Sequence, residues 1–356
     1  MTISICIVTG RRLVLLDECL ASIEAQVDPP PYEVLVCSDG DRDVAEAVHR
    51  RHPDARVCFV ETALPGAARN LLVDQARGDL LLFLDDDATL EPHALALLAR
   101  LTREHPDAGV FGGPNDTPPG SSRFQVVQGA VLASIVGSGP VRRRYGAHPA
   151  RWADERFFIL CNLAVRRDVM VPFSHDLVCA EENALLDEMS RGGVAMFYDP
   201  ALVAYHHRRP SLRGFAQQMF KYGRGRGQLS VTRPRTIRPA YLAPTLLLAY
   251  ALATPALALL FSPVALVPLG LYGLAVLAAA GWVAKTLRRP ADLPLASLLL
   301  LVLHATYGAG LVVGLFDGRR RREPPQVLEW AMGSRAEGTG AAEGSEAVDA
   351  AAPDRG

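Results

Sequence analysis

Short apolar runs alternate with segments of helical periodicity over the first 85 residues. Three runs rich in Val, Ile and Cys occupy residues 3–9, 33–38 and 56–60. After the first run, apolar residues recur at helical spacing at Leu13, Leu16, Leu20 and Ile23. This alternation predicts βαβ units around a mostly parallel sheet, and therefore an α/β fold.

A fourth run, residues 79–84, is almost wholly apolar, as expected of a strand buried on both faces. It ends abruptly in three carboxylates, Asp85, Asp86 and Asp87. Binding sites of open α/β sheets gather at the carboxyl ends of the strands. The acidic triplet is therefore expected at the functional edge of the sheet.

The pattern changes twice further along the chain. Residues 111–230 are irregular, with a Gly- and Pro-rich loop at 111–120 and a helix over 180–191 that Gly192 and Gly193 end. The composition then turns strongly apolar. Three long uncharged stretches occupy residues 241–261, 264–284 and 293–316.

Each of these stretches approaches the roughly 20 residues that a helix needs to cross a bilayer. The basic residues before the first stretch, with Lys285, Arg288 and Arg289 after the second, place both flanks in the cytosol and predict a hairpin. A third span would leave the basic residues at 319–322 outside, against the same rule. We therefore expect two or three membrane helices in a cytoplasmic-membrane protein whose first domain faces the cytosol.

Composition and the two ends of the chain add four expectations. The net charge of −1 conceals a basic stretch at residues 206–238, which suits membrane phosphates or a diphosphate. No nucleic-acid-binding motif accompanies this stretch, so nucleic acid is not an expected partner. Six scattered cysteines without metal-site spacing predict buried free thiols. The N-terminus lacks the features of a signal peptide, and the tail at 317–356 is basic and then of disordered composition.

The aspartate triplet has two interpretations. Three adjacent carboxylates repel one another unless a cation compensates, and Mg²⁺ or Mn²⁺ held by one or two carboxylates keeps coordination sites for substrate phosphates. Alternatively, the triplet is an acidic loop in which Asp87 caps a following helix.

Two further segments lie at the same predicted edge. Asp39 and Gly40 follow the second strand, where an acidic residue can hold a ribose hydroxyl or a base edge, although a simple turn explains them as well. Arg69 and Asn70 lie at a helix start, where the guanidinium can contact a base or a phosphate or form a surface ion pair.

The segments SICIVTGRR, VLVCSDGDRD, PGAARN and GDLLLFLDDD, in this order and spacing, resemble the family 2 glycosyltransferases, which share the glycosyltransferase A (GT-A) fold. The likeness continues through FGG, CNLAVRRDV, AEENALL and DPALVAYHHRR to KYGRGRG, over residues 1–228. It implies a Rossmann-like mixed sheet followed by transmembrane helices. By this resemblance residues 1–110 bind a nucleotide sugar, 111–230 bind the acceptor and carry the catalytic base, 231–240 form a basic linker and 241–316 form the membrane helices.

The resemblance also implies roles for individual residues. Thr9, Asp39 and Arg69 would line the nucleoside pocket. Asp85 and Asp87 would form the Asp-x-Asp motif, with Asp87 closest to the metal and Asp85 and Asp86 beside the nucleotide sugar. Gly10 stands where the family commonly has an aromatic residue followed by Asn.

An acidic pair, Glu181 and Glu182, opens the predicted helix at 180–191 where the family usually has Glu-Asp, whose second member is the base. Independently of the family, a carboxylate that deprotonates an acceptor hydroxyl needs hydrogen-bond reach and a tuned pKa. The alternative is that acidic residues in a first turn only complement the helix dipole.

Two more features complete the candidates. His206 follows a strand-like run and is expected near the metal or the donor phosphates, or else in a partly exposed loop. Phe215, Met219 and Tyr222 share one helical face next to basic residues, which predicts either an amphipathic helix on anionic lipid or a helix packed in the core.

Together these features predict a metal-dependent inverting glycosyltransferase that moves a sugar from a nucleotide-diphosphate donor to a membrane-associated glycan or lipid-linked acceptor. Two alternatives remain open: a polyprenyl-phosphate sugar synthase, in which a lipid phosphate attacks, and a membrane-tethered nucleotide-sugar-binding module without catalysis.

Overall fold

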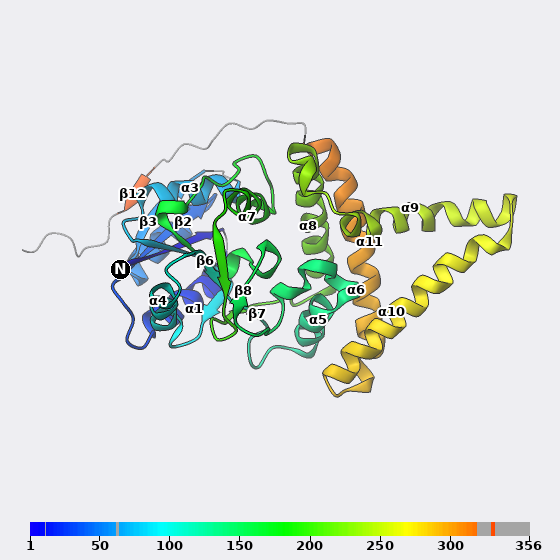
Figure 1. The fold of residues 1–356 in the computed structure, drawn as a ribbon, viewed down its shortest axis with the longest axis horizontal. Coiled ribbons are helices and arrows are strands. Elements are labelled where there is room, and N and C mark those ends of the chain that lie inside the picture. The colour runs from blue at the N-terminus through cyan, green and yellow to red at the C-terminus, as the bar shows by residue number, and fades with distance from the viewer. Residues whose placement is uncertain (11, 62–63, 319–328, 332–356) are drawn as a thin grey trace, which may run out of the picture.

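The computed structural model describes residues 1–10, 12–61, 64–318 and 329–331. A nine-stranded mixed sheet forms the centre of the N-terminal domain (Figure 1). Its strands in spatial order are β12 (Glu329–Ala331), β3 (Arg56–Val60), β2 (Tyr32–Asp39), β1 (Ile3–Thr9), β4 (Leu80–Asp85), β9 (Leu163–Arg166), β6 (Ala108–Gly112), β10 (Ala195–Tyr198) and β8 (Arg151–Trp152).

Strands β3, β2, β1 and β4 are parallel, whereas β9 runs antiparallel between β4 and β6. The four strands expected from apolar runs are all present, each within one residue of its predicted bounds. The antiparallel insertion makes the sheet mixed, as the GT-A resemblance implied. A small second sheet consists of β5 (Ala88–Leu90), β11 (Ala204–His206) and β7 (Asn115–Asp116).

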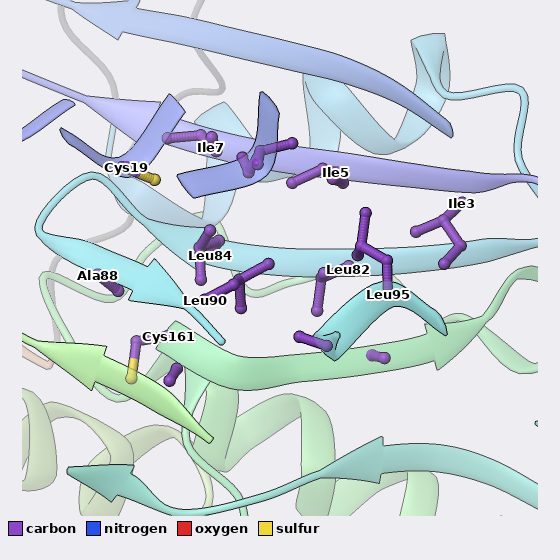
Figure 2. Packing of buried hydrophobic residues seen from close by; sticks show 14 of the residues in the cluster. Ile3, Ile5, Ile7, Cys19, Leu82, Leu84, Ala88, Leu90, Leu95 and Cys161 are labelled. Atoms are coloured by element: carbon purple, nitrogen blue, oxygen red, sulfur yellow. The ribbon is translucent and has the colours of Figure 1, made fainter. Parts of the chain in front are cut away.

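Helices cover both faces of the large sheet. They are α1 (Leu13–Glu24), α2 (Arg42–Arg51), α3 (Pro65–Gln75), α4 (Ala94–Glu104) and α7 (Glu181–Arg191). Leu82 and Leu84 point into the core shown in Figure 2, together with Leu95 of α4, while Leu81 and Phe83 belong to the core of the other face. Strand β4 is therefore buried on both sides, which explains its uninterrupted apolar run.

The C-terminal part begins with two helices, α5 (Arg123–Ala133) and α6 (Ile135–Ser138), and a 3₁₀ segment, Gly139–Arg144. The chain bends sharply between α5 and α6. Helix α8 (Leu212–Thr232) then lies side by side with α11 (Leu293–Asp317) (Figure 1). In the sequence between these two helices, α9 (Pro239–Leu260) and α10 (Val267–Thr286) form a V-shaped hairpin that projects away from the domain (Figure 1).

Glycines allow α8 and α11 to approach closely. A Cβ atom on Gly223 would lie 2.0 Å from the Tyr307 carbonyl oxygen, and one on Gly310 would lie 2.1 Å from that of Phe220. Small residues at four-residue spacing permit such backbone contact between apolar helices.

The structure corrects one interpretation of the sequence. Phe215 is fully buried and Met219 is 2% exposed, so α8 packs in the core and the expectation of an amphipathic helix on lipid is wrong. In the tail, residues 329–331 form β12 against β3, while residues 319–322 and those beyond 331 lie outside the described residues.

All six cysteines are free thiols, five of them buried, as their scattered positions predicted.

Candidate active site

The parallel strands β1, β2 and β4 end at one edge of the sheet, above a cavity of about 730 Å³. Thr9, Asp39 and Asp85, the last residues of these strands, all line it. The rest of the wall comes from α7, β11, α8 and the apolar helices. The strand topology therefore brings together the polar residues that the sequence predicted at this edge.

Asp86 and Asp87 are almost fully buried, with exposures of 0% and 1%. The hydroxyl of Thr9 donates to Asp86 at 2.8 Å, and the Arg12 guanidinium pairs with both carboxylates. Arg209 lies 3.3 Å from Asp87. Two arginines thus neutralise carboxylates that would otherwise repel one another in a desolvated site.

Burial raises the pKa of Asp86 to about 6, against the opposing attraction of Arg12. Burial also opposes the ionisation of Asp87, but His206, Arg12 and Arg209 outweigh it and hold the pKa of Asp87 well below its usual value. Neighbouring carboxylates of one motif therefore differ in affinity for protons: Asp86 takes up a proton as the pH falls through about 6, whereas Asp87 stays ionised well below that pH.

Asp85, Asp87 and His206 each offer a ligand atom within 4.8 Å of the others. Two carboxylates and an imidazole suit Mn²⁺ or Mg²⁺, with coordination sites left for other oxygen ligands.

The surroundings of His206 also fit a metal ligand. Asn115 lies with its amide nitrogen 3.5 Å from Nδ1 of His206, and its buried Oδ1 has no hydrogen-bond partner among the described residues. Rotating this amide by half a turn, with the Arg208 guanidinium 3.5 Å from Nδ1 turned away, lets Oδ1 accept a hydrogen bond from Nδ1–H, which leaves Nε2 free to coordinate a cation.

The acidic pair lies at the start of α7, after a strained residue. Ala180 has a left-handed backbone (φ 69°, ψ 20°), which non-glycine residues rarely adopt. Glu181 accepts from Arg69 at 2.6 Å, and Arg69 also contacts Asp85 at 3.2 Å. Burial raises the pKa of Glu181, although Arg69 opposes this effect.

Glu182 has different partners. Its Oε1 lies 3.3 Å from a guanidinium nitrogen of Arg144 and accepts from the Asn183 amide at 2.7 Å. Glu181 is therefore held in a buried ion-pair network that leads to the aspartates, whereas Glu182 is held at the cavity wall by an arginine from the 3₁₀ segment.

All nine residues selected from the sequence line this one cavity, namely Thr9, Asp39, Arg69, Asp85, Asp86, Asp87, Glu181, Glu182 and His206. Arg69 is 6% exposed and ion-paired, so the surface salt bridge considered for it is wrong. The helix cap considered for Asp87 is also wrong, because β5 follows it and α4 begins only at Ala94.

Sequence reasoning gave no individual role to four arginines that line the same cavity: Arg12, Arg144, Arg209 and Arg226. Arg12 follows the first strand in GRR, a visible signal. The others come from loops and a helix whose approach to the sheet edge depends on tertiary packing.

Comparisons with known proteins agree with this geometry. Residues 4–171 match the family described as Glycosyl transferase family 2. Succinoglycan biosynthesis protein ExoA of Rhizobium meliloti (strain 1021) is 26% identical over 322 residues, covering 86% of this chain and 92% of that protein. The uncharacterized glycosyltransferase YwdF of Bacillus subtilis (strain 168) is 31% identical over 159 residues, covering 41% of this chain and 59% of that protein.

Among solved structures, mannosyltransferase PcManGT from Pyrobaculum calidifontis, in complex with GDP-Man and Mn²⁺, shares the fold with a TM-score of 0.55. The match has 21% sequence identity and covers 88% of this chain and 87% of that one. The mixed sheet, the carboxylate edge and the family match lead to one conclusion: the chain is a glycosyltransferase with a family 2 domain of the GT-A fold.

Proposed function

We propose that this enzyme is a metal-dependent inverting glycosyltransferase that moves a sugar from a nucleotide-diphosphate donor to a lipid-linked or other membrane-associated glycan. The observation that carries the proposal is the single cavity in which Asp85, Asp87 and His206 share a wall with Glu182. Donor activation and acceptor deprotonation can therefore take place on one bound pair of substrates.

Asp85, Asp87 and His206 would hold Mg²⁺ or Mn²⁺. The ion would supply positive charge to the diphosphate as the donor bond breaks. PcManGT, which shares the fold, is described in complex with Mn²⁺ and a nucleotide sugar. Thr9 and Asp39, at the ends of β1 and β2, would contact the nucleoside. Asp86, which accepts from Thr9 and pairs with Arg12, would lie beside it.

Glu182 is the proposed base. It takes the proton from the acceptor hydroxyl while that oxygen attacks the anomeric carbon on the face opposite the leaving diphosphate, which inverts the configuration. Glu181 and Arg69 act as positioning residues, because their ion pairs join the base-bearing helix to Asp85.

The apolar helices support membrane attachment. Within the described residues, three helical segments, Pro239–Leu260, Pro263–Thr286 and Pro290–Asp317, are long and apolar enough to cross a bilayer, and the bent pair Arg123–Ala133 and Ile135–Arg144 would be a fourth if it formed one span. In the three segments, 6%, 17% and 44% of the most apolar part is buried in the protein. The proposed membrane anchor is the α9–α10 hairpin, whose two ends lie at the catalytic domain (Figure 1). We propose that this domain faces the cytosol.

Helix α11 has both ends tied to the domain. Asp292 at its start pairs with Arg123 of α5, and Asp317 at its end accepts from Arg224 of α8 at 2.6 Å. We therefore propose that α11 lies along the domain instead of crossing the bilayer. This placement would avoid the conflict with the positive-inside rule that a third span would create.

The experiment is a donor screen with the detergent-solubilised full chain. Nucleoside diphosphates and their sugars are tested for thermal stabilisation with Mn²⁺, Mg²⁺ or EDTA, since a ligand that binds only the native state raises stability. We expect one donor to stabilise the protein only with metal, and Asp87→Asn, which keeps the side-chain shape, to lose that effect. Stabilisation that is equal in EDTA would refute the metal role.

A transfer assay with the selected donor and membrane lipid extract then identifies the product. NMR of its anomeric proton should report configuration opposite to that of the donor. A retained configuration would contradict the mechanism, and a product with the sugar directly on a lipid phosphate would replace the proposed reaction with that of a polyprenyl-phosphate sugar synthase.

A further inference from the structure

The cavity at the sheet edge does not end at Glu182. It continues between the apolar helices, where Val136 of α6, Leu247 of α9, and Leu303 and His304 of α11 line it. We call this part the apolar branch. Donor binding and base catalysis need only the carboxylate end, so the apolar branch has no role in the reaction described above.

Hydrogen bonds hold the apolar branch open in a defined shape. His304 donates through Nε2 to the Val136 carbonyl at 2.8 Å and, through Nδ1, accepts from the Tyr272 hydroxyl at 2.8 Å. One imidazole therefore ties α6, α10 and α11 together. Polar groups within apolar helices are costly unless paired, and their presence marks a site that is built rather than incidental.

Cationic side chains lie where the apolar branch meets the carboxylate end. Arg144 and Arg226 are 6% and 9% exposed, and both donate to the same Oδ1 atom of Asn183, at 2.7 and 3.2 Å. Lys221 is exposed at the wall of the same cavity. Arg144 also lies 3.3 Å from Glu182, whereas no described carboxylate forms an ion pair with Arg226 or Lys221, so the three cations together keep a net positive charge.

The two arginines also keep unused capacity for an anion. Nε of Arg144 is buried and has no hydrogen-bond partner in the part of the chain that the structure describes. Arg226 makes no ion pair with a described carboxylate; its guanidinium instead lies 4.2 Å from the centre of the Tyr241 ring, at the start of α9. Unpaired buried donors cost free energy unless a ligand satisfies them.

We propose that Arg144, Arg226 and Lys221 bind the phosphate or diphosphate of an isoprenoid-type lipid acceptor, with the first part of its hydrocarbon chain in the apolar branch. This inference rests on the proposed function and adds the subsite for the acceptor's lipid end. Charge and hydrophobicity change along the cavity in the order that such an amphiphile requires. The lipid would enter from the side of α9, a helix of the proposed membrane anchor whose Leu247 lines the apolar branch.

The test uses the detergent-solubilised full chain in EDTA, so that a diphosphate cannot bind through a metal at Asp85 and Asp87. Thermal stabilisation is titrated with farnesyl diphosphate, inorganic pyrophosphate, farnesol and phosphatidylglycerol. We expect farnesyl diphosphate to act at a concentration at least about ten-fold lower than any of the others, because only it fills both parts of the site. An equal effect of pyrophosphate, or of phosphatidylglycerol, would overturn the proposal.

Two pairs of variants locate the ligand. Arg226→Gln should weaken farnesyl diphosphate binding by about ten-fold or more, whereas Arg213→Gln, an exposed position on the same helix, should leave it unchanged. Leu247→Trp should block the apolar branch and weaken farnesyl diphosphate without affecting pyrophosphate, whereas Leu246→Trp, on the exposed side of α9, should change neither. Unaltered binding in Arg226→Gln and Leu247→Trp would refute the assigned subsite.

Metal-dependent stabilisation by the nucleotide separates this inference from the proposed function. If the nucleotide and Mn²⁺ stabilise the wild type and Arg226→Gln alike while farnesyl diphosphate has no effect, the lipid subsite is wrong and the glycosyltransferase mechanism stands. If the nucleotide has no effect and farnesyl diphosphate binds, the donor assignment fails instead.

Discussion

Nε2 of His206 lies 2.8 Å from Oδ1 of Asp87, although 119 residues separate them in the chain. Antiparallel pairing of β11 with β5 sets His206 opposite Ala88, and the His207 amide donates to the Asp87 carbonyl at 2.9 Å. Strand pairing in the small sheet therefore fixes the imidazole of His206 beside the end of β4.

Asn115 should control which nitrogen of His206 is available to a metal. Asn115→Leu removes the acceptor for Nδ1–H, so we expect Mn²⁺ affinity to fall by about ten-fold or more. Asn115→Asp keeps an acceptor and should retain most of the affinity. Titration of Mn²⁺ against thermal stability measures both, and equal affinity in Asn115→Leu and wild type would show that the amide has no such role.

The two glutamates should differ in what their loss affects. Glu182→Gln should lower the transfer rate by about a hundred-fold or more, as expected of a general base, with nucleotide binding retained. Glu181→Gln should instead lower the free energy of unfolding by about 1–3 kcal/mol, because it leaves buried Arg69 with only Asp85. Single-turnover rates and denaturant unfolding separate the two effects; reversed results would exchange the assigned roles.

Ala180 stores strain directly before the acidic pair. Because a left-handed conformation costs an L-residue about 1 kcal/mol or more, Ala180→Gly should raise the melting temperature by about 2–3 °C. Ala184→Gly, buried in the right-handed interior of α7, should lower it. A lower melting temperature for Ala180→Gly would mean that the Cβ atom contributes more packing than the backbone costs.

Close packing of α8 on α11 should depend on glycine. Gly223→Ala inserts a methyl group 2.0 Å from a backbone oxygen and should lower the melting temperature by several degrees, since the two backbones must separate. Gly270→Ala on α10, where a Cβ meets nothing within 4 Å, is the control and should be neutral or slightly stabilising. Equal behaviour of the two variants would show that α8 and α11 do not touch in the membrane-bound protein.

The position of α11 can be read from topology reporters in a bacterial host. A green fluorescent protein joined after Gly318 should be fluorescent and one joined after Phe261, at the tip of the hairpin, should not be, if only α9 and α10 enter the bilayer. Alkaline phosphatase at the same points should give the opposite pattern. Phosphatase activity at Gly318 would establish a third span.

The sequence pattern alone was enough to predict those helices and strands whose surroundings are the same along their whole length. Strand β4 is buried on both faces, so its apolar run and the aspartates at its end were visible without coordinates. The uncharged helices α9, α10 and α11 were visible for the same reason, as was the family resemblance carried by short motifs at strand ends.

Tertiary structure alone decided which charges meet. Arg144, Arg209 and Arg226 look like surface residues in the sequence, because a charge carries no periodic signal of the partner it will meet. Their places depend on how loops and α8 pack over the sheet edge, and on glycines that let α11 approach. Whether an apolar helix crosses a bilayer or lies along its own domain is likewise set by what packs against it, which local hydropathy does not encode.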